Sequence, residues 1–321
     1  MAGQWQVFRR LGLGPFRTLV GEVARGPAMI RWLDNETNVK GRANENFARE
    51  LFELFTLGRD QGYVEADVKE AARAFTGWTI RKDAFWFDHS KHDGGLKRVL
   101  GHEGRLDGEA VLDLAVAHEA CARHVAAKLL ACFVGPAAPP EAVAELAAVF
   151  RAADGDVARC LEVLLGSELF FDPAQRGTRI RGPVEWILWV LRTLGLRASP
   201  RALHRAAARM GQALLEPPDV AGWDEEEAWI SSATWIHRQN FAARLASAEG
   251  RPELRPGLED VVPGDDDGYA YLGPTLFPDG LGQGSARAVA RLGEAGRGLP
   301  REQRLAGLCE TLWMLPEAHR F

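Results

Sequence analysis

The stretch NENFARELFELFTLG, residues 44–58, decides the fold, because its apolar residues recur every three to four positions. Residues such as Phe47 and Leu51 fall on one half of a helical wheel, and charged or amide side chains fill most of the other half. Asn44 is suited to cap the amino end of a helix and Gly58 to end it. The stretch therefore predicts an amphipathic helix whose apolar half packs on a core.

The same spacing continues through most of the chain, with proline and glycine between the segments. It predicts helices at about 66–75, 109–134, 139–153, 156–170, 182–195, 199–214, 228–247 and 285–314. The exception is 78–101, whose aromatic and β-branched residues predict a short hairpin that pairs 85–87 with 98–100. The predicted fold class is mainly α: a multi-helix, bundle-like domain with one short β-hairpin near residues 78–101.

Composition also divides the chain into segments. Residues 1–248 predict one helical domain that includes the small β element. Residues 249–284 are rich in Gly, Pro and Asp, which is typical of a linker or a long surface loop. Residues 285–321 predict a C-terminal helical segment that packs on the main domain.

The overall composition excludes several classes of protein. With 321 residues, 46% hydrophobic residues and a formal net charge of −5, the chain is typical of a globular protein and not of a collagen or a disordered segment. The mild acidity argues against a nucleic-acid partner, because phosphates are usually bound by an excess of basic residues. No apolar run reaches the roughly 18 residues that a membrane span needs. The first residues do not have the pattern of a signal peptide.

The polar half of the 44–58 helix is the first candidate for chemistry. Glu45, Arg49 and Glu53 follow one another at intervals of four, so a Glu–Arg–Glu ladder can form along one face. Together with Glu50, these carboxylates could hold a divalent cation, or one of them could serve as a general base. The alternative is a solvated face held together by ion pairs.

The second candidate is the segment from His89 to Lys97, which includes His92 and Asp93. Imidazole and carboxylate groups at this spacing can ligate a metal or donate a proton near neutral pH. The alternative is a turn in which Asp93 accepts a hydrogen bond from its own backbone before two glycines.

Tryptophan is the third feature, with ten residues in the chain. Several, including Trp78 and Trp223, stand beside polar motifs. Aromatic rings next to charged groups are typical of carbohydrate-stacking sites, but also of thick helical cores. The chain contains no Gly-rich phosphate loop and no nucleophile elbow. We therefore expect no nucleotide or nicotinamide cofactor, and a divalent metal ion stays open as a cofactor.

A series of short motifs extends the pattern of residues 44–58 along the chain. They are Asp67-Val68, Ala72-Arg73-Ala74-Phe75-Thr76-Gly77-Trp78, His92-Asp93 with Lys97, Pro183-x-Glu185, Gly211-Gln212, Pro217-Pro218-Asp219-Val220-x-Gly222-Trp223, Arg238-x-Asn240 and Pro316-Glu317. Together they resemble a bacterial family named only as the domain of unknown function number eighteen hundred. The resemblance implies a mostly helical protein of unassigned activity, whose gene often lies beside that of a sulfatase- or phosphatase-like protein.

The resemblance also bears on the start of the chain and on its location. Members of the family usually begin with a longer helical region, so we expect this chain to be truncated at its N-terminus. A motif lost there would leave the site incomplete. The resemblance implies an exported or periplasmic protein, although the chain carries no signal peptide as written.

Two hypotheses follow for the function. The first is a hydrolase-like site, metal-assisted or not, that acts on an anionic or polyhydroxylated component of the cell envelope or on a polysaccharide. It assigns catalysis to Glu50, Arg49, His92 and Lys97, substrate binding to Asn46, Arg73, Trp78 and Trp223, and metal binding to Glu45, Glu53 and Asp93. The second is a non-catalytic helical partner or scaffold for the sulfatase- or phosphatase-like protein. The first hypothesis requires the acidic face of the 44–58 helix to meet the bend at His92 and Asp93.

Overall fold

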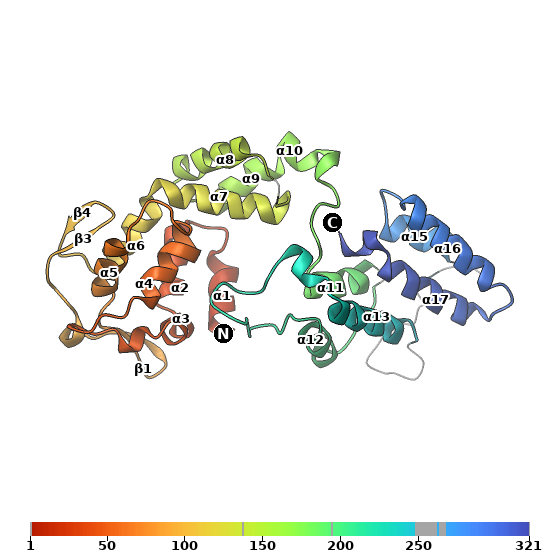
Figure 1. Cartoon of the computed structure of the whole chain (residues 1–321), viewed down its shortest axis with the longest axis horizontal. Helices are drawn as coiled ribbons and strands as arrows, with labels where there is room; N and C mark the ends of the chain where they lie inside the picture. Colours follow the sequence, from red (N-terminus) through yellow and green to blue (C-terminus); the bar gives the residue numbers. More distant parts are fainter. Residues whose placement is uncertain (1, 137, 194, 248–261, 263–267, 321) are drawn as a thin grey trace. The chain divides into compact units, whose positions relative to one another are not determined.

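The chain forms two compact units, residues 1–175 (unit 1) and 176–321 (unit 2), drawn in Figure 1. The computed structural model describes residues 2–136, 138–193, 195–247, 262 and 268–320. Both units are mainly helical, so the predicted fold class is confirmed. The boundary between them falls inside the region that the sequence predicts as one domain. Within the described ranges, no helix is both long and apolar enough to cross a lipid bilayer.

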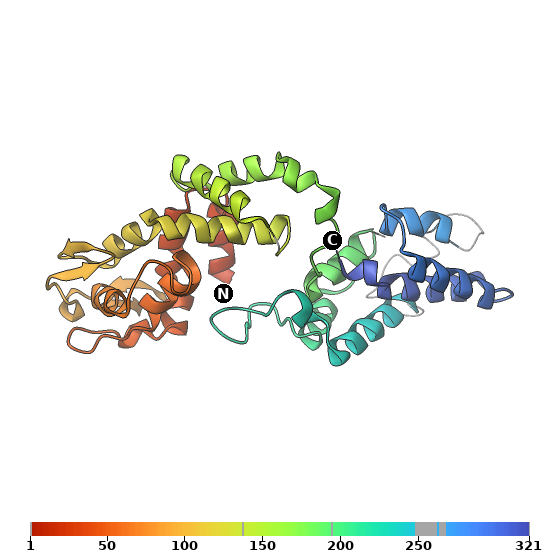
Figure 2. The same ribbon diagram turned by 45° about the horizontal axis from the view of Figure 1, so that its top comes forward.

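Unit 1 combines a helical body with two small hairpins. Its α-helices are α1 (Ala2–Leu11), α2 (Phe16–Ala24), α3 (Pro27–Trp32), α4 (Asn46–Glu50), α5 (Glu65–Ala74), α6 (Gly108–Ala117), α7 (Glu119–Phe133), α8 (Pro140–Ala152), α9 (Val157–Leu165) and α10 (Glu168–Phe171). Its strands are β1 (Trp78–Arg81), β2 (Ala84–Phe87), β3 (Lys97–Val99) and β4 (His102–Gly104), and short turns of other helix types are η1 (Asn35–Thr37), η2 (Leu51–Thr56), η3 (His89–Lys91) and η4 (Pro173–Gln175). Helices α7 and α8 lie side by side in both views (Figures 1 and 2).

The decisive 44–58 segment is helical, as predicted, but it is not a single α-helix. It begins as α4 and continues through η2, which is a π-helical turn. The N-cap position is Glu45, one residue after the predicted Asn44, and the Asn44 side chain accepts a hydrogen bond from the Asn46 backbone N–H at 3.0 Å, which satisfies one donor of the amino end. His124 of α7 donates from Nε2 to the Leu54 carbonyl at 2.9 Å, since a carbonyl can only accept. A π turn leaves carbonyls without their usual partner within the helix, and His124 satisfies one of them.

The strands do not pair as the sequence predicts. The predicted pairing of 85–87 with 98–100 is wrong, because β1 pairs with β2 and β3 pairs with β4, both antiparallel. Lys82–Asp83 connects β1 to β2, and Leu100–Gly101 connects β3 to β4. The φ angle is positive at both residues of each turn. Such tight turns join strands that are adjacent in sequence, so each short strand finds its partner locally.

An aromatic cluster forms part of the core of unit 1. Trp78, at the start of β1, is buried against Phe47 of α4, Phe75 at the end of α5, and Phe85 of β2. Its ring centroid lies 5.1 Å from those of Phe75 and Phe85, and these rings meet edge to face, a favourable arrangement for aromatic pairs. The contacts hold the first hairpin against α4 and α5, which carry many of the predicted site residues.

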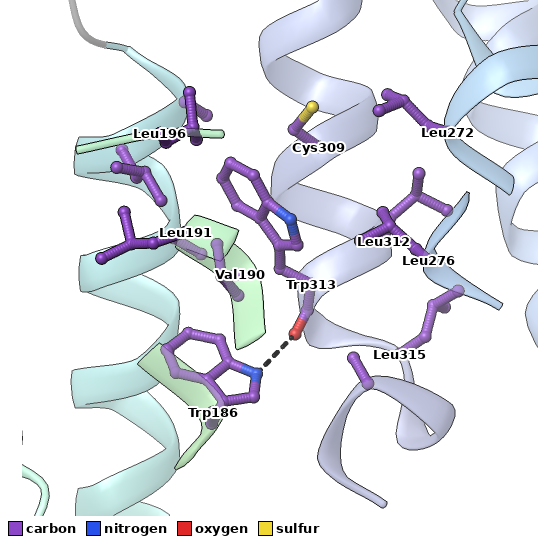
Figure 3. Close-up of a cluster of buried hydrophobic side chains, with 14 of the residues drawn as sticks. Trp186, Val190, Leu191, Leu196, Leu272, Leu276, Cys309, Leu312, Trp313 and Leu315 are labelled. Atoms are coloured by element: carbon purple, nitrogen blue, oxygen red, sulfur yellow. Dashed lines mark hydrogen bonds between the residues drawn. The ribbon is translucent and has the colours of Figure 1, made fainter. Parts of the chain in front are cut away.

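Unit 2 is built around a second core. Its elements are α11 (Pro183–Thr193), α12 (Pro200–Arg209), η5 (Glu226–Trp229), α13 (Ser232–Ala246), α15 (Tyr269–Leu276), α16 (Gln283–Ala295), α17 (Arg301–Met314) and η6 (Pro316–His319). Figure 3 shows the core, where the Trp186 indole N–H of α11 donates to the Trp313 carbonyl of α17 at 3.3 Å. Helix α15 contributes Leu272 and Leu276 to this core, although it lies inside the predicted linker. Of that linker, residues 249–261 and 263–267 lie outside the described residues.

Candidate functional site

Arg49 stands at the centre of the acidic face of the 44–58 segment. Its guanidinium pairs with Glu45 at 2.9 Å and with Glu53 at 3.5 Å, which confirms the predicted Glu–Arg–Glu ladder. It also binds both carboxylate oxygens of Glu65, the first residue of α5, at 2.7 and 3.0 Å. These carboxylates, Glu65 foremost, raise the pKa of Arg49. Glu45, Arg49, Glu53 and Glu65 form the Arg49 cluster, which ties α4 to α5.

A second group of charged residues lies near the other end of α5. Arg73 Nε donates to Asp93 Oδ2 at 2.8 Å, and its Nη1 donates to Glu70 at 2.7 Å. The hydrogen bond from Arg73, more than any other interaction, lowers the pKa of Asp93 to about 2. Asp93 is therefore ionised at neutral pH and too weak a base for general base catalysis, which works best with a pKa near the operating pH.

Thr76 fixes the bend at His92 and Asp93. Its hydroxyl donates to the Arg73 carbonyl at 2.6 Å and accepts from the Asp93 N–H at 2.8 Å. His92 Nδ1 lies 2.9 Å from the Thr76 carbonyl and must carry a proton, since that carbonyl can only accept. The Lys97 ammonium is buried and donates to two backbone carbonyls of the bend. Arg73, Thr76, His92, Asp93 and Lys97 form the Arg73 cluster.

The two clusters are separate groups, each attached to a different end of α5. Glu65 opens α5 and Arg73 lies eight positions later, a separation of about 12 Å along the helix axis. In the described part of the chain, no hydrogen bond or ion pair joins the Arg49 cluster to the Arg73 cluster. The fold thus brings the predicted acidic face and the His–Asp bend to the same helix, but each is held by its own arginine.

The carboxylates predicted as metal ligands do not gather in one place. Glu45 and Glu53 belong to the Arg49 cluster, and Asp93 belongs to the Arg73 cluster. Among the side chains that the structure describes, no three His, Cys, Asp or Glu groups lie close enough together to hold a metal ion. A divalent cation of the calcium type needs several oxygen ligands at once. The arrangement of Glu45, Glu53 and Asp93 therefore lends no support to a shared metal site.

The remaining predicted site residues lie in different environments. Glu50 is partly buried at the end of α4, and Asn46 is exposed at the first position of that helix. Trp78 is buried in the aromatic cluster of unit 1, where its ring packs on other side chains instead of facing solvent. Trp223 is partly buried and belongs to unit 2.

Two buried amides, Asn35 and Asn38, were missed by the sequence reasoning. The Asn38 side chain donates to the Ala72 carbonyl of α5 at 2.9 Å, and its Oδ1 accepts from the Asn44 N–H at 3.0 Å. Asn35 donates to the Trp78 carbonyl at 2.9 Å. The two amides fasten the loop before α4 to α5 and β1. They lie between regular helices, so no periodic pattern marks them.

Unit 2 contains a buried basic centre. Sequence reasoning identified its Arg238 only as part of the Arg238-x-Asn240 motif and assigned it no role in a site. Arg238 of α13 is fully buried, and its guanidinium donates to the Arg181 carbonyl at 2.9 Å and to His319 Nδ1 at 3.0 Å. Burial lowers the pKa of Arg238 to about 10. Burial, with the two arginines, lowers the pKa of His319 to about 3. One signal could have indicated that Arg238 is buried: it shares a helix face with Trp235 and Leu245.

The fold and these networks define a mainly α-helical protein of two units, with polar motifs held in ion-paired clusters. In a comparison with protein families, residues 1–318 match the family described as "Protein of unknown function (DUF1800)". The chain belongs to this family, and the resemblance drawn from its motifs is confirmed. Comparison with curated proteins and with solved structures gives no match.

The pairing of Asp93 with Arg73 predicts a pH-dependent contribution to stability. The carboxyl has a pKa of about 2 in the folded chain, against about 3.9 when unfolded. Its stabilisation is therefore fully present above about pH 4 and is lost as the pH falls towards 2. We expect Asp93→Asn to lower the free energy of unfolding by about 1–3 kcal/mol at neutral pH, and the gap to wild type to close in that window. Urea unfolding followed by circular dichroism measures the free energy of unfolding of the variant and of wild type at each pH.

The matched control for this prediction is Asp83→Asn. Asp83 pairs with Arg31 in the β1–β2 turn, but its side chain is 87% exposed. Exposed ion pairs contribute little to stability, so the free energy of unfolding of this variant should remain within about 1 kcal/mol of wild type. Its stability should also follow pH as that of wild type does. A gap between Asp93→Asn and wild type that stayed constant down to pH 2 would contradict the prediction.

Proposed function

We propose that the chain is a non-catalytic helical module that docks a partner protein. The class of partner comes from the family resemblance, which implies a sulfatase- or phosphatase-like protein encoded nearby. The main support is that the candidate catalytic side chains in the Arg49 and Arg73 clusters are engaged within unit 1. Arg49 is held by ion pairs, and His92 and Lys97 donate hydrogen bonds to backbone carbonyls.

The ionisable groups of the two clusters serve as fastenings between elements of unit 1. Arg49 binds three carboxylates and joins α4 to α5. Arg73 holds Asp93, whose pKa of about 2 makes it a poor proton acceptor. The Lys97 ammonium is buried, and burial lowers its pKa, while its hydrogen bonds go to the backbone. These side chains therefore hold the helices and the bend in fixed positions. A module that docks a partner needs such a fixed surface.

Exposed tryptophans supply a docking surface on unit 1. Trp32, at the end of α3, and Trp86, on β2, each expose about half of their surface. Helix α3 contacts β1, the strand that pairs with β2, and Arg31 of α3 pairs with Asp83 of the β1–β2 turn at 3.1 Å. Aromatic residues are enriched at protein interfaces, where they fill pockets of the partner.

The proposal is tested by measuring binding of the full chain to the sulfatase- or phosphatase-like protein of the same gene neighbourhood. We expect the double variant Trp32→Ala, Trp86→Ala to weaken binding by about tenfold or more, because aromatic anchors dominate interface energies. Phe171→Ala removes another exposed aromatic ring of unit 1 and is the matched control. Glu50→Gln should bind like wild type. Failure of the wild-type chain to bind this partner would contradict the proposal.

One observation favours the enzyme hypothesis as a second candidate. Because His92 Nδ1 donates to the Thr76 carbonyl, Nε2 is the ring nitrogen that can accept a proton, as a general base must. The hypothesis predicts turnover of an anionic or polyhydroxylated envelope substrate by the chain alone. It further predicts that His92→Asn and Glu50→Gln each abolish this turnover. Turnover that both variants retain would remove these residues from the mechanism.

A further inference from the structure

Helix α12 presents a basic face to solvent. Arg201, Arg205 and Arg209 follow one another at intervals of four and are all exposed, with exposed His204 beside them. Successive arginines are about 6 Å apart along the helix axis. The opposite side, with buried Ala207, packs against α11 and α13. Arg201, His204, Arg205 and Arg209 form the α12 basic face.

The α12 basic face has no acidic partner in the part of the chain that the structure describes. None of its four side chains has an ion pair or a hydrogen bond there. The sequence from 186 to 215 contains five arginines and no Asp or Glu. By contrast, two other exposed helical arginines each have an acidic partner within one turn: Arg123 binds Glu119 at 2.7 Å and Arg159 binds Glu162 at 2.9 Å. In a chain of net charge −5, this face is therefore a local excess of positive charge.

Helix stability does not account for the whole row of arginines. Arg209 lies in the last turn of α12, where a cation interacts favourably with the helix dipole. Arg201 lies in the first turn, where a cation is unfavourable and an acidic residue would stabilise the helix. The row thus extends to a position where it costs stability, which is expected when the side chains serve a ligand.

We propose that the α12 basic face binds a linear polyanion, namely an acidic polysaccharide with carboxylate or sulfate groups. Guanidinium groups bind such oxyanions through paired hydrogen bonds, and an evenly spaced row suits charges repeated along a chain. Between residues 200 and 210, all of which the structure describes, no large apolar side chain is exposed. Membrane insertion and stable protein interfaces both use such side chains. This proposal does not depend on the docking function, which uses unit 1.

The test compares the full chain with two triple variants. Dextran sulfate and polygalacturonate are the polyanions, and uncharged dextran is the negative control. Wild type binds both polyanions, and its affinity falls as salt rises. Arg201→Gln, Arg205→Gln, Arg209→Gln weakens binding by about tenfold or more and makes the salt dependence shallower, because three ionic contacts are lost. Glutamine propagates a helix nearly as well as arginine, so α12 is preserved.

The second triple variant controls for overall charge. Arg123→Gln, Arg159→Gln, Arg176→Gln removes the same charge from three exposed arginines that are paired with acids. It should bind the polyanions within about twofold of wild type, since the α12 basic face is intact. Equal losses in the two triple variants, or no binding by wild type, would overturn the proposal. Tighter binding to duplex DNA or to phosphatidylglycerol vesicles than to either polysaccharide would overturn it as well.

Discussion

Replacing Arg238 by alanine is expected to lower the free energy of unfolding of unit 2 by about 3–5 kcal/mol. The side chain is fully buried against the Trp186 ring, so its truncation leaves a cavity in the core. The change also removes the donor to the Arg181 carbonyl and to His319 Nδ1. The cavity lowers the stability of the core, and each acceptor that loses its donor lowers it further. The single substitution Arg238→Ala has all of these effects.

Arg238→Met separates the volume of this side chain from its charge. Methionine fills most of the space, and loss of the guanidinium relieves the desolvation that lowers the pKa of Arg238 to about 10. We therefore expect a smaller loss, about 1–2 kcal/mol. Hydrogen exchange of the full chain measures both variants: exchange should rise in α11, α13 and α17 and stay unchanged in α7 and α8. An alanine variant within about 1 kcal/mol of wild type would contradict this role for Arg238.

The helical part of the fold could be predicted because the spacing of apolar residues is a local property of the sequence. What the spacing does not show is where one helix ends and the next begins. The helix predicted over 109–134 is divided at His118, whose side chain accepts from the Ala120 N–H at 3.1 Å and caps α7. Likewise, Lys82–Asp83 forms a tight turn without the Gly or Asn that usually marks one, so the pairing of β1 with β2 was missed.

The candidate site could be predicted only where its contacts are local. The ladder around Arg49 follows from residues spaced by four, but the bidentate partner Glu65 lies 16 positions away. Arg73 and Asp93 are 20 positions apart, and Arg238 reaches His319 across 81. These pairs depend on the packing of the whole unit. The residues that looked catalytic by type are therefore assigned their roles by tertiary neighbours that spacing alone does not identify.

Acidification is expected to destabilise unit 2 through His319. The ring is buried between Trp186 and Trp235, and Arg238 and Arg181 add positive charge, so its pKa falls to about 3. The unfolded chain binds a proton near pH 6.5 that the folded chain excludes. Stability is therefore full above about pH 6.5 and is lost as the pH falls towards 3. The loss is about 1.4 kcal/mol per pH unit, or about 2 kcal/mol between pH 6.5 and 5.

His319→Asn isolates this effect, because an amide oxygen can replace Nδ1 as the acceptor for Arg238 and does not titrate. The variant loses the ring between the two tryptophans and should be less stable than wild type at pH 7. It should lose less stability on acidification, so the free energies of unfolding measured in urea should converge towards pH 5. His204→Asn, at an exposed position of α12, should keep the wild-type dependence. Parallel curves for His319→Asn and wild type would exclude His319 as the source, whereas convergence assigns the acid sensitivity of unit 2 to this one buried ring.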